Sequence, residues 1–233
     1  MIGAMRVVAV ADTHLFHDEL RVPDGDVFIH AGDLCRGGGL DDLEVAARWL
    51  ASLPHPTKVA IAGNHDWAFV RSPADAQRIL GPEVIYLQDS GVLLNGLRFW
   101  GSPWQPEFND WAFNLPRGPN LREKWALIPE DIDLLVTHGP PYGIGDSTGC
   151  DGGGYAGPDR LGCEELRARV LDIRPMLHLF GHIHDAGGAW SIGATTFANV
   201  TTWECERGPT VLDIDLGLRK VTLVDVPPSK RCA

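Results

Sequence analysis

Short apolar runs that finish in polar residues recur along the first half of the chain. Residues 6–12, 26–33 and 58–64 each join β-branched and small apolar side chains to a polar end, which is typical of buried strands. Residues 40–53 carry apolar side chains at helical spacing, with acidic residues in the first turn. Residues 72–80 predict another helix, with Ser72 as N-cap and Gly81 at its end. Strand and helix therefore alternate.

The second half is richer in strands. Residues 91–104 predict a hairpin, because Asn95-Gly96 is a typical tight turn between two strands. Other apolar runs predict strands over 84–89, 132–138, 175–184, 189–193, 195–202 and 211–226, and helices over 122–128 and 163–173. Together these elements predict an α/β fold of two mixed β-sheets packed together with helices outside, formed by a single domain over residues 1–233.

Composition narrows the class of function. The 233 residues carry a net charge of −11, and such an acidic surface argues against binding of long nucleic acids. Five widely spaced cysteines argue against a disulfide framework and for a reducing compartment. No apolar run approaches the roughly 18 residues that cross a bilayer. We expect a cytoplasmic protein that acts on small molecules without a membrane partner. Its oligomeric state stays open, with a homodimer as one option.

Polar residues with ligand chemistry stand at the ends of five predicted strands. Because open α/β sheets place their ligands beyond the carboxyl ends of the strands, we expect these residues to converge. Buried together without a partner they would be costly, and divalent ions remove that cost. Two ions that share a carboxylate fit the number of donors, and imidazole with oxygen ligands suits Mn, Fe, Zn, Co or Ni. The donors are Asp12, His14, Asp33, Asn64, His138, His182 and His184.

The motifs D-x-H, G-D, G-N-H-D, H-G and G-H-x-H resemble those of the calcineurin-like metallophosphoesterase superfamily. Longer segments such as "IAGNHD", "GSPWQPEF" and "IDLLVTHGPP" are similar to the branch that contains the mammalian metallophosphoesterase-domain proteins and class III cyclic nucleotide phosphodiesterases. The resemblance extends from about Val8 to Asp215 and implies a four-layer α-β-β-α sandwich, in which helices flank two mixed β-sheets.

The resemblance also assigns roles motif by motif. It implies that Asp33 bridges two ions and that His65 binds no metal but contacts the phosphate and protonates the leaving oxygen, with Asp66 orienting it. The first ion is expected on Asp12, His14 and His184, and the second on Asn64, His138 and His182. Some mammalian members of this branch carry glycine in place of a histidine of the G-H-x-H motif and are weak enzymes. This chain keeps both histidines, so a full two-ion site is expected.

These features predict a dinuclear metal-dependent phosphodiesterase. The resemblance implies that a hydroxide between the ions attacks the phosphorus of a cyclic nucleotide or a similar small diester, with manganese the ion most suited to support activity. A phosphomonoesterase or phosphoprotein phosphatase on the same site is the alternative. A third possibility is a non-catalytic scaffold, as in membrane-coat complexes with a decayed metal site. The complete ligand set counts against the scaffold.

Several remaining residues have more than one interpretation. His30 and His178 lie within strands and are predicted to be core residues, whereas His17 and His55 lie in loops and are predicted to be solvated. The glycine-rich segment 139–157 lacks the ending of a phosphate-binding P-loop and is predicted to be a rim loop.

Arg117 could neutralise a phosphate oxygen or form a surface ion pair. Trp67, after the G-N-H-D motif, is well placed for stacking. A further aromatic cluster predicts either a minor core, which we favour, or a stacking wall for a nucleobase. It comprises Trp100, Trp104, Phe108, Trp111 and Phe113.

Overall fold

A computed structural model describes residues 3–148 and 159–228. Its first sheet has the order β16-β15-β1-β2-β3-β4, in which the last four strands run parallel to one another. β15 and β16 extend the sheet as antiparallel strands. The bounds are β1 Ala4–Val10, β2 Val27–Ala31, β3 Thr57–Ile61, β4 Ile85–Tyr86, β15 Thr210–Asp215 and β16 Lys220–Asp225.

The second sheet has the order β13-β14-β12-β9-β6-β5. Its four central strands are parallel, and each edge strand pairs antiparallel with its neighbour. The bounds are β5 Ser90–Leu94, β6 Leu97–Ser102, β9 Leu134–Thr137, β12 Leu177–Phe180, β13 Gly188–Ile192 and β14 Thr195–Asn199. The predicted hairpin turn is confirmed, because Asn95 and Gly96 both have positive φ, 51° and 80°.

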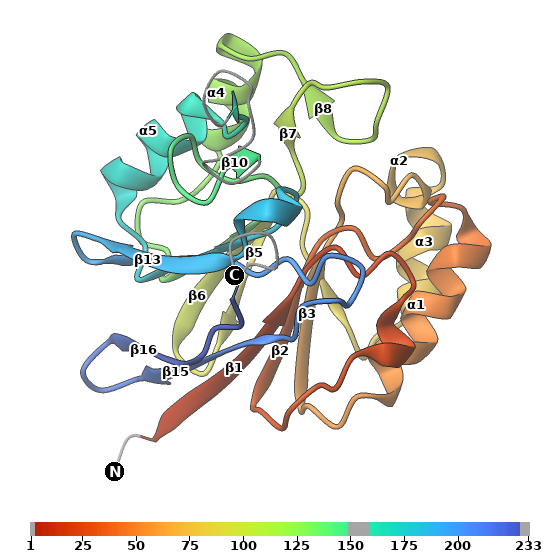
Figure 1. Ribbon diagram of the computed structural model, residues 1–233, viewed down its shortest axis with the longest axis horizontal. Coiled ribbons are helices and arrows are strands. Elements are labelled where there is room, and N and C mark those ends of the chain that lie inside the picture. The colour runs from red at the N-terminus through yellow and green to blue at the C-terminus, as the bar shows by residue number, and fades with distance from the viewer. Residues whose placement is uncertain (1–2, 149–158, 229–233) are drawn as a thin grey trace.

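Helices cover the outer face of each sheet. α1 (Leu40–Ser52) and α3 (Pro73–Leu80) pack on the first sheet, at the right of Figure 1, and α4 (Pro119–Trp125) and α5 (Glu164–Ile173) pack on the second. The short elements are η1 His17–Glu19, α2 Ala68–Arg71, β7 Gln105–Pro106, β8 Asn114–Leu115, β10 Ser147–Thr148, β11 Asp159–Arg160 and η2 His184–Ala186. Among the described residues, no helix combines the length and apolar character that crossing a membrane requires.

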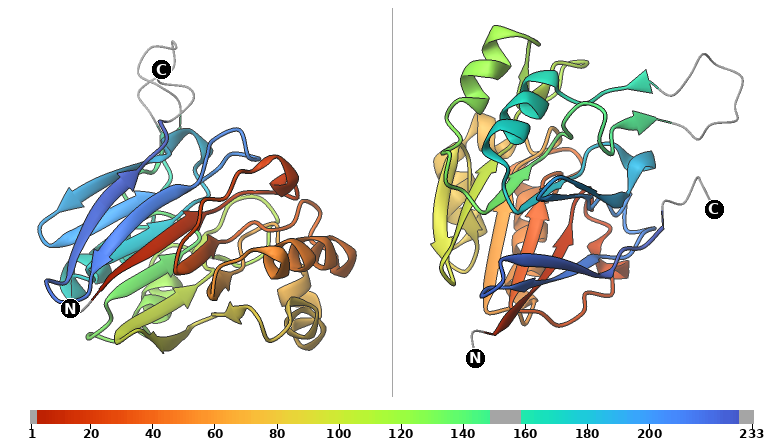
Figure 2. Two further views of the ribbon diagram at one scale, coloured as in Figure 1. Left: turned by 90° about the horizontal axis from the view of Figure 1, so that it is seen from below. Right: turned by 90° about the vertical axis from the view of Figure 1, so that its left-hand side faces the viewer.

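Three apolar layers hold this arrangement together. One lies between the two sheets, and the others lie between each sheet and its helices. The alternation in β2 shows how one strand serves two layers, because Val27 and Ile29 face the other sheet while Phe28 faces α1. The predicted four-layer sandwich is therefore confirmed, and Figure 2 shows its two sheets stacked face to face.

Some local predictions need correction. Ser72 precedes α3 as predicted, but its side chain makes no capping hydrogen bond. His17 and His55, predicted to be solvated, are buried. His17 stacks on Trp49 at 4.6 Å between ring centroids, and His55 donates to the carbonyl of Pro23. Aromatic rings from other segments, Trp49 beside His17 and Phe28 beside His55, cover these two side chains.

Candidate metal centre

The predicted donors meet at one rim of the sandwich, where β1, β2, β3, β9 and β12 end. Three groups of side chains place their ligand atoms within 4.8 Å of one another. They are Asp12, His14 and His184; His14, Asp33 and His65; and Asp33, His138 and His182. The predicted convergence is therefore present, and Asp12 and His182, which are 170 residues apart, are in direct contact.

The first group surrounds Asp12. Nε2 of His184 lies 3.7 Å from a carboxylate oxygen of Asp12, and the rings of His14 and His184 are 5.5 Å apart. The carboxylate of Asp12 also accepts the backbone N–H of His182 at 3.0 Å, which joins the end of β1 to the loop after β12.

The third group, Asp33, His138 and His182, is joined at His138 by Asn64 and forms the second half of the centre. Nε2 of His138 lies 2.9 Å from Oδ1 of Asn64 and 3.4 Å from Oδ2 of Asp33, and its ring is 5.0 Å from that of His182. Asp33 also lies 3.8 Å from Nε2 of His14 in the first group. Asp33 is thus the carboxylate that stands between the two groups.

The orientation of the imidazoles fits metal binding. Nδ1 of His14 donates to the carbonyl of Cys35 at 3.2 Å, and Nδ1 of His138 donates to the carbonyl of Ala31 at 2.9 Å. A histidine whose Nδ1 proton is held by a carbonyl presents Nε2 to a metal. Buried carboxylates among such nitrogens form a donor set that suits two transition-metal ions.

The electrostatics of the centre agree with this fit. Burial alone would raise the pKa of Asp33, but the charges of His138 and His14 hold it well below its usual range. Burial opposes the charged form of His138, yet Asp33 raises its pKa to about 9. Both ring nitrogens of His138 face acceptors, as expected for an imidazolium. A metal ion would replace its Nε2 proton, so ions and protons compete here.

The ligand loops hold strained backbone. Asp12, His14, Asp33 and His182 have φ values of 57°, 44°, 58° and 68°, a region that non-glycine residues adopt at a cost of about 1 kcal/mol or more each. Such strain persists where surrounding contacts over-determine the backbone, and it clusters at functional sites. The close packing also explains why residue 63 is a glycine, because a Cβ there would lie 2.3 Å from Oδ1 of Asp33.

Comparison with known proteins agrees with this geometry. The family model for calcineurin-like phosphoesterases matches residues 5–186. The chain belongs to the calcineurin-like phosphoesterase family. Metallophosphoesterase domain-containing protein 1 of Homo sapiens is 39% identical over 91% of this chain and 72% of its own length. A UPF0046 protein of Caenorhabditis elegans is 36% identical over 88% of this chain and 71% of its own length.

Solved structures share the fold of this chain at low sequence identity. The crystal structure of TT1561 from Thermus thermophilus aligns with a TM-score of 0.60 at 16% identity, covering 96% of this chain and 99% of that one. Another crystal structure aligns with a TM-score of 0.69 at 15% identity, again over 96% of this chain. These likenesses concern the fold alone.

His65 is held from three sides. Its backbone N–H donates to Asp33 at 2.8 Å, and its Nδ1 donates to the carbonyl of Arg36 at 2.9 Å. The indole of Trp111 stacks on its ring at 4.1 Å between centroids. With Nδ1 engaged, Nε2 is the ring nitrogen that remains for another ligand, and His65 shares one of the three donor groups with His14 and Asp33. Trp111 belongs to the predicted aromatic cluster, but its stacking on His65 was not predicted.

Asp66 does not orient His65, contrary to the prediction. Its buried carboxylate accepts backbone N–H groups of Leu34, Cys35 and Gly63 at 2.8–3.2 Å. Burial and the nearby charge of Asp33 raise its pKa to about 6. Asp66 thus joins the loop after β2 to the loop after β3. Both loops carry predicted metal ligands, so its carboxylate stabilises their backbone and does not contact the His65 ring.

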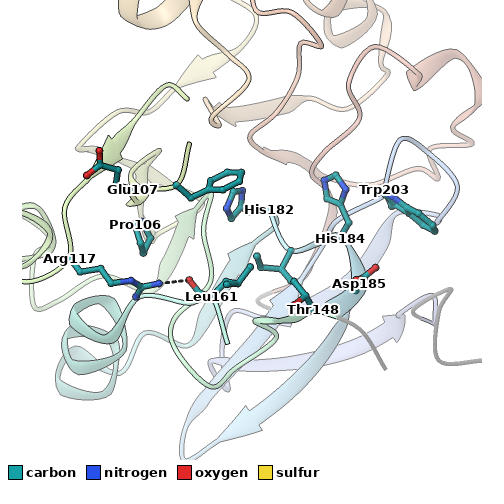
Figure 3. Close-up of a pocket in the computed structure, with 11 residues that line it drawn as sticks. Pro106, Glu107, Arg117, Thr148, Leu161, His182, His184, Asp185 and Trp203 are labelled. Carbon is teal, nitrogen blue, oxygen red and sulfur yellow. Dashed lines mark hydrogen bonds between the residues drawn. The ribbon is translucent and has the colours of Figure 1, made fainter. Parts of the chain in front are cut away.

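A pocket of about 390 Å³ opens beside the metal centre. Figure 3 shows His182 and His184 between Arg117 and Leu161 on one side and Trp203 on the other. Phe108 also lines the pocket, with 45% of its surface exposed and its ring 5.7 Å from that of His182.

The predicted aromatic cluster divides into two parts. Phe113 is buried, and Trp100 of β6 and Trp104 pack against the layer between the second sheet and its helices, as the favoured core interpretation holds. Phe108 and Trp111 instead lie at the site. Trp67, predicted for stacking, is covered by the guanidinium of Arg71 at 4.4 Å and packs against the helical layer.

Arg117 makes no ion pair among the described residues, and its other predicted role, neutralising a phosphate oxygen, stays a prediction. Its guanidinium donates to the carbonyls of Gly162 and Leu161 at 2.7 and 2.9 Å, at the edge of the pocket. The predicted rim loop lies partly outside the described residues. Its described beginning includes Ile144, which is buried in the layer under α4 and α5, and Thr148, which lines the pocket.

Proposed function

We propose that this protein is a dinuclear metal-dependent phosphodiesterase that hydrolyses cyclic nucleotides or similar small phosphodiesters. The observation that carries the proposal is the meeting of two donor groups at Asp33, beside a pocket whose wall includes the apolar side chains of Phe108 and Leu161. Asp12, His14 and His184 would hold one ion, Asn64, His138 and His182 the other, and Asp33 would contact both.

Two bound divalent ions supply Lewis acidity toward the phosphate oxygens and lower the pKa of bound water toward neutrality. The residues of the chain hold the reacting groups in position. Asp33 anchors the backbone of His65, so this ring keeps a constant position relative to the donors. The Arg36 carbonyl and the Trp111 ring fix its rotation, and Nε2 is left to hold a proton at the leaving oxygen of the ester.

The pocket is suited to the organic part of a nucleotide. Phe108 and Leu161 expose 45% and 41% of their surfaces there, which offers apolar contact to a planar base. Arg117 has five N–H donors. Two hydrogen bonds join its guanidinium to backbone carbonyls. Its remaining donors and its charge favour a substrate that carries acceptor atoms or negative charge beyond the scissile phosphate.

Turnover of matched substrates tests the proposal. Protein supplied with Mn²⁺ should hydrolyse an aryl phosphodiester and 2′,3′- or 3′,5′-cyclic AMP, and should act more slowly on the corresponding monoesters and on phosphoserine. His65→Ala should lose turnover while retaining metal. Loss of all diester activity in a protein shown to contain both ions would contradict the proposal, and faster monoester turnover would favour the phosphatase alternative.

A further inference from the structure

We propose that His30 and His178 are positioning residues for the two halves of the metal centre, each acting through the threonine beside a ligand histidine. The inference rests on the two-ion site proposed above. Both histidines were predicted to be core residues, and both are fully buried, outside the three donor groups. Each nevertheless makes a side-chain hydrogen bond that leads directly into a ligand loop.

The contact of His178 reaches the second half of the centre. Its Nε2 lies 2.8 Å from Oγ1 of Thr137, and that hydroxyl donates to the carbonyl of Gly139 at 2.8 Å. Because a carbonyl can only accept, the single hydroxyl proton belongs to this second bond, and His178 must donate its Nε2–H to Thr137. The ligand His138 stands between Thr137 and Gly139, so these two bonds clamp its backbone.

The contact of His30 reaches the first half. Its Nε2 lies 2.9 Å from Oγ1 of Thr13. Thr13 stands between the ligands Asp12 and His14, whose φ values of 57° and 44° are strained for non-glycine residues. A fixed hydroxyl at the centre of this turn holds a conformation that the backbone alone disfavours.

The two arrangements are equivalent in the two sheets. In β2 the neighbours of His30, Ile29 and Ala31, face the layer between the sheets, so His30 points toward α1 and lies 6.2 Å from the ring of Trp49. In β12, His178 likewise faces the helix-covered side, where its ring is 5.7 Å from that of Phe197.

Packing alone does not account for histidine at these positions. In both rings Nδ1 is buried and has no hydrogen-bond partner among the described residues. A buried polar atom without a partner destabilises the folded chain, and an apolar side chain of similar size would avoid that loss. Among the described residues, the bond from Nε2 to a threonine of a ligand loop is the contact that favours a polar side chain over an apolar one at these positions.

Site-resolved metal occupancy tests the inference. Crystals of wild type, His30→Leu and His178→Leu would be equilibrated with limiting Mn²⁺, and anomalous peaks would give the occupancy of each ion. His178→Leu should weaken binding about tenfold at the ion near His138, and His30→Leu should do so at the ion near Asp12. His178→Gln, which keeps an N–H donor near Nε2, should restore occupancy.

His55→Leu is the matched control. His55 is also buried, and its Nδ1 has no partner in the part of the chain that the structure describes, but its Nε2 bonds to the Pro23 carbonyl away from the donors. It should change neither occupancy. Thr137→Val removes the same bonds without emptying the core, so it should reproduce the effect of His178→Leu, and the double variant should lose no more than either single change.

The results of this test can be told apart from the results that test the proposed function. Selective loss of one ion with rescue by glutamine would support the inference even in a protein that hydrolyses no diester. Equal loss of both ions, unchanged occupancies, or failure of His178→Gln to rescue would overturn it while diester activity stands. If His178→Leu does not fold, Thr137→Val alone gives the same readings. A wild-type protein that binds no Mn²⁺ would overturn both proposals.

Discussion

The burial of His178 leads to a prediction about stability whose size can be calculated. Desolvation lowers the pKa of His178 from 6.5 to about 3. Its ordinary pKa returns on unfolding, so between these values the unfolded chain binds a proton that the folded chain does not. The contribution of the neutral ring to stability is complete above about pH 7. It is lost progressively as the pH falls below 6.5.

The magnitude follows from linkage. At about pH 5 the unfolded histidine is stabilised by RT ln(1 + 10^1.5), which is about 2 kcal/mol. His178→Gln keeps an N–H donor but does not titrate. We therefore predict that, between about pH 7.5 and about pH 5, the free energy of unfolding of the wild type falls by about 2 kcal/mol more than that of His178→Gln.

Urea denaturation followed by tryptophan fluorescence, with a chelator present, measures this difference. Every other titrating group, including His30, is common to both proteins and cancels in the comparison. The dependence of the unfolding free energy on urea should be the same in both, which would show that both unfold from equally compact states. An equal fall in stability in the two proteins would refute the reasoning, because it would mean that His178 is not held neutral by burial.

Three other predictions concern the metal centre and pocket. Asn64→Ala should weaken metal binding and activity together, whereas His65→Ala should lower kcat by roughly 10²-fold or more with both ions retained, as metal analysis of the two variants would show. Arg117→Ala should raise the KM for cyclic nucleotides about tenfold and leave the KM for a small aryl methyl diester nearly unchanged, with the surface variant Arg78→Ala as control. Equal effects on both KM values would contradict this role. Metal uptake near neutral pH should release protons because the pKa of His138 is raised to about 9 in the metal-free protein, and calorimetry in buffers of different ionisation enthalpy would detect the release.

The position of the donors could be predicted because each follows a strand. The runs that end at Asp12, Asp33 and Asn64 became β1, β2 and β3 and the loops after them, and parallel neighbours in a sheet bring such loops to one edge. The runs before His138 and His182 became β9 and β12 of the second sheet. The sequence pattern of each strand was sufficient to locate these donors, because each donor follows the end of a strand.

What could not be predicted depends on backbone atoms and on contacts between distant segments. The acceptors that orient His14 and His65 are the carbonyls of Cys35 and Arg36, and any residue type offers a carbonyl. Asp66 was assigned to His65 because it is next to it in sequence, yet its carboxylate binds backbone N–H groups of another loop. The buried states of His17 and His55 likewise depend on segments far along the chain.

The central claim is that seven side chains hold two metal ions with Asp33 between them. Anomalous diffraction from a crystal grown with Mn²⁺ tests it most directly. We predict two peaks about 3.5–4 Å apart, both within bonding distance of the Asp33 carboxylate, one facing Asp12 and the other facing Asn64. A single peak, or two peaks that Asp33 does not join, would contradict the account.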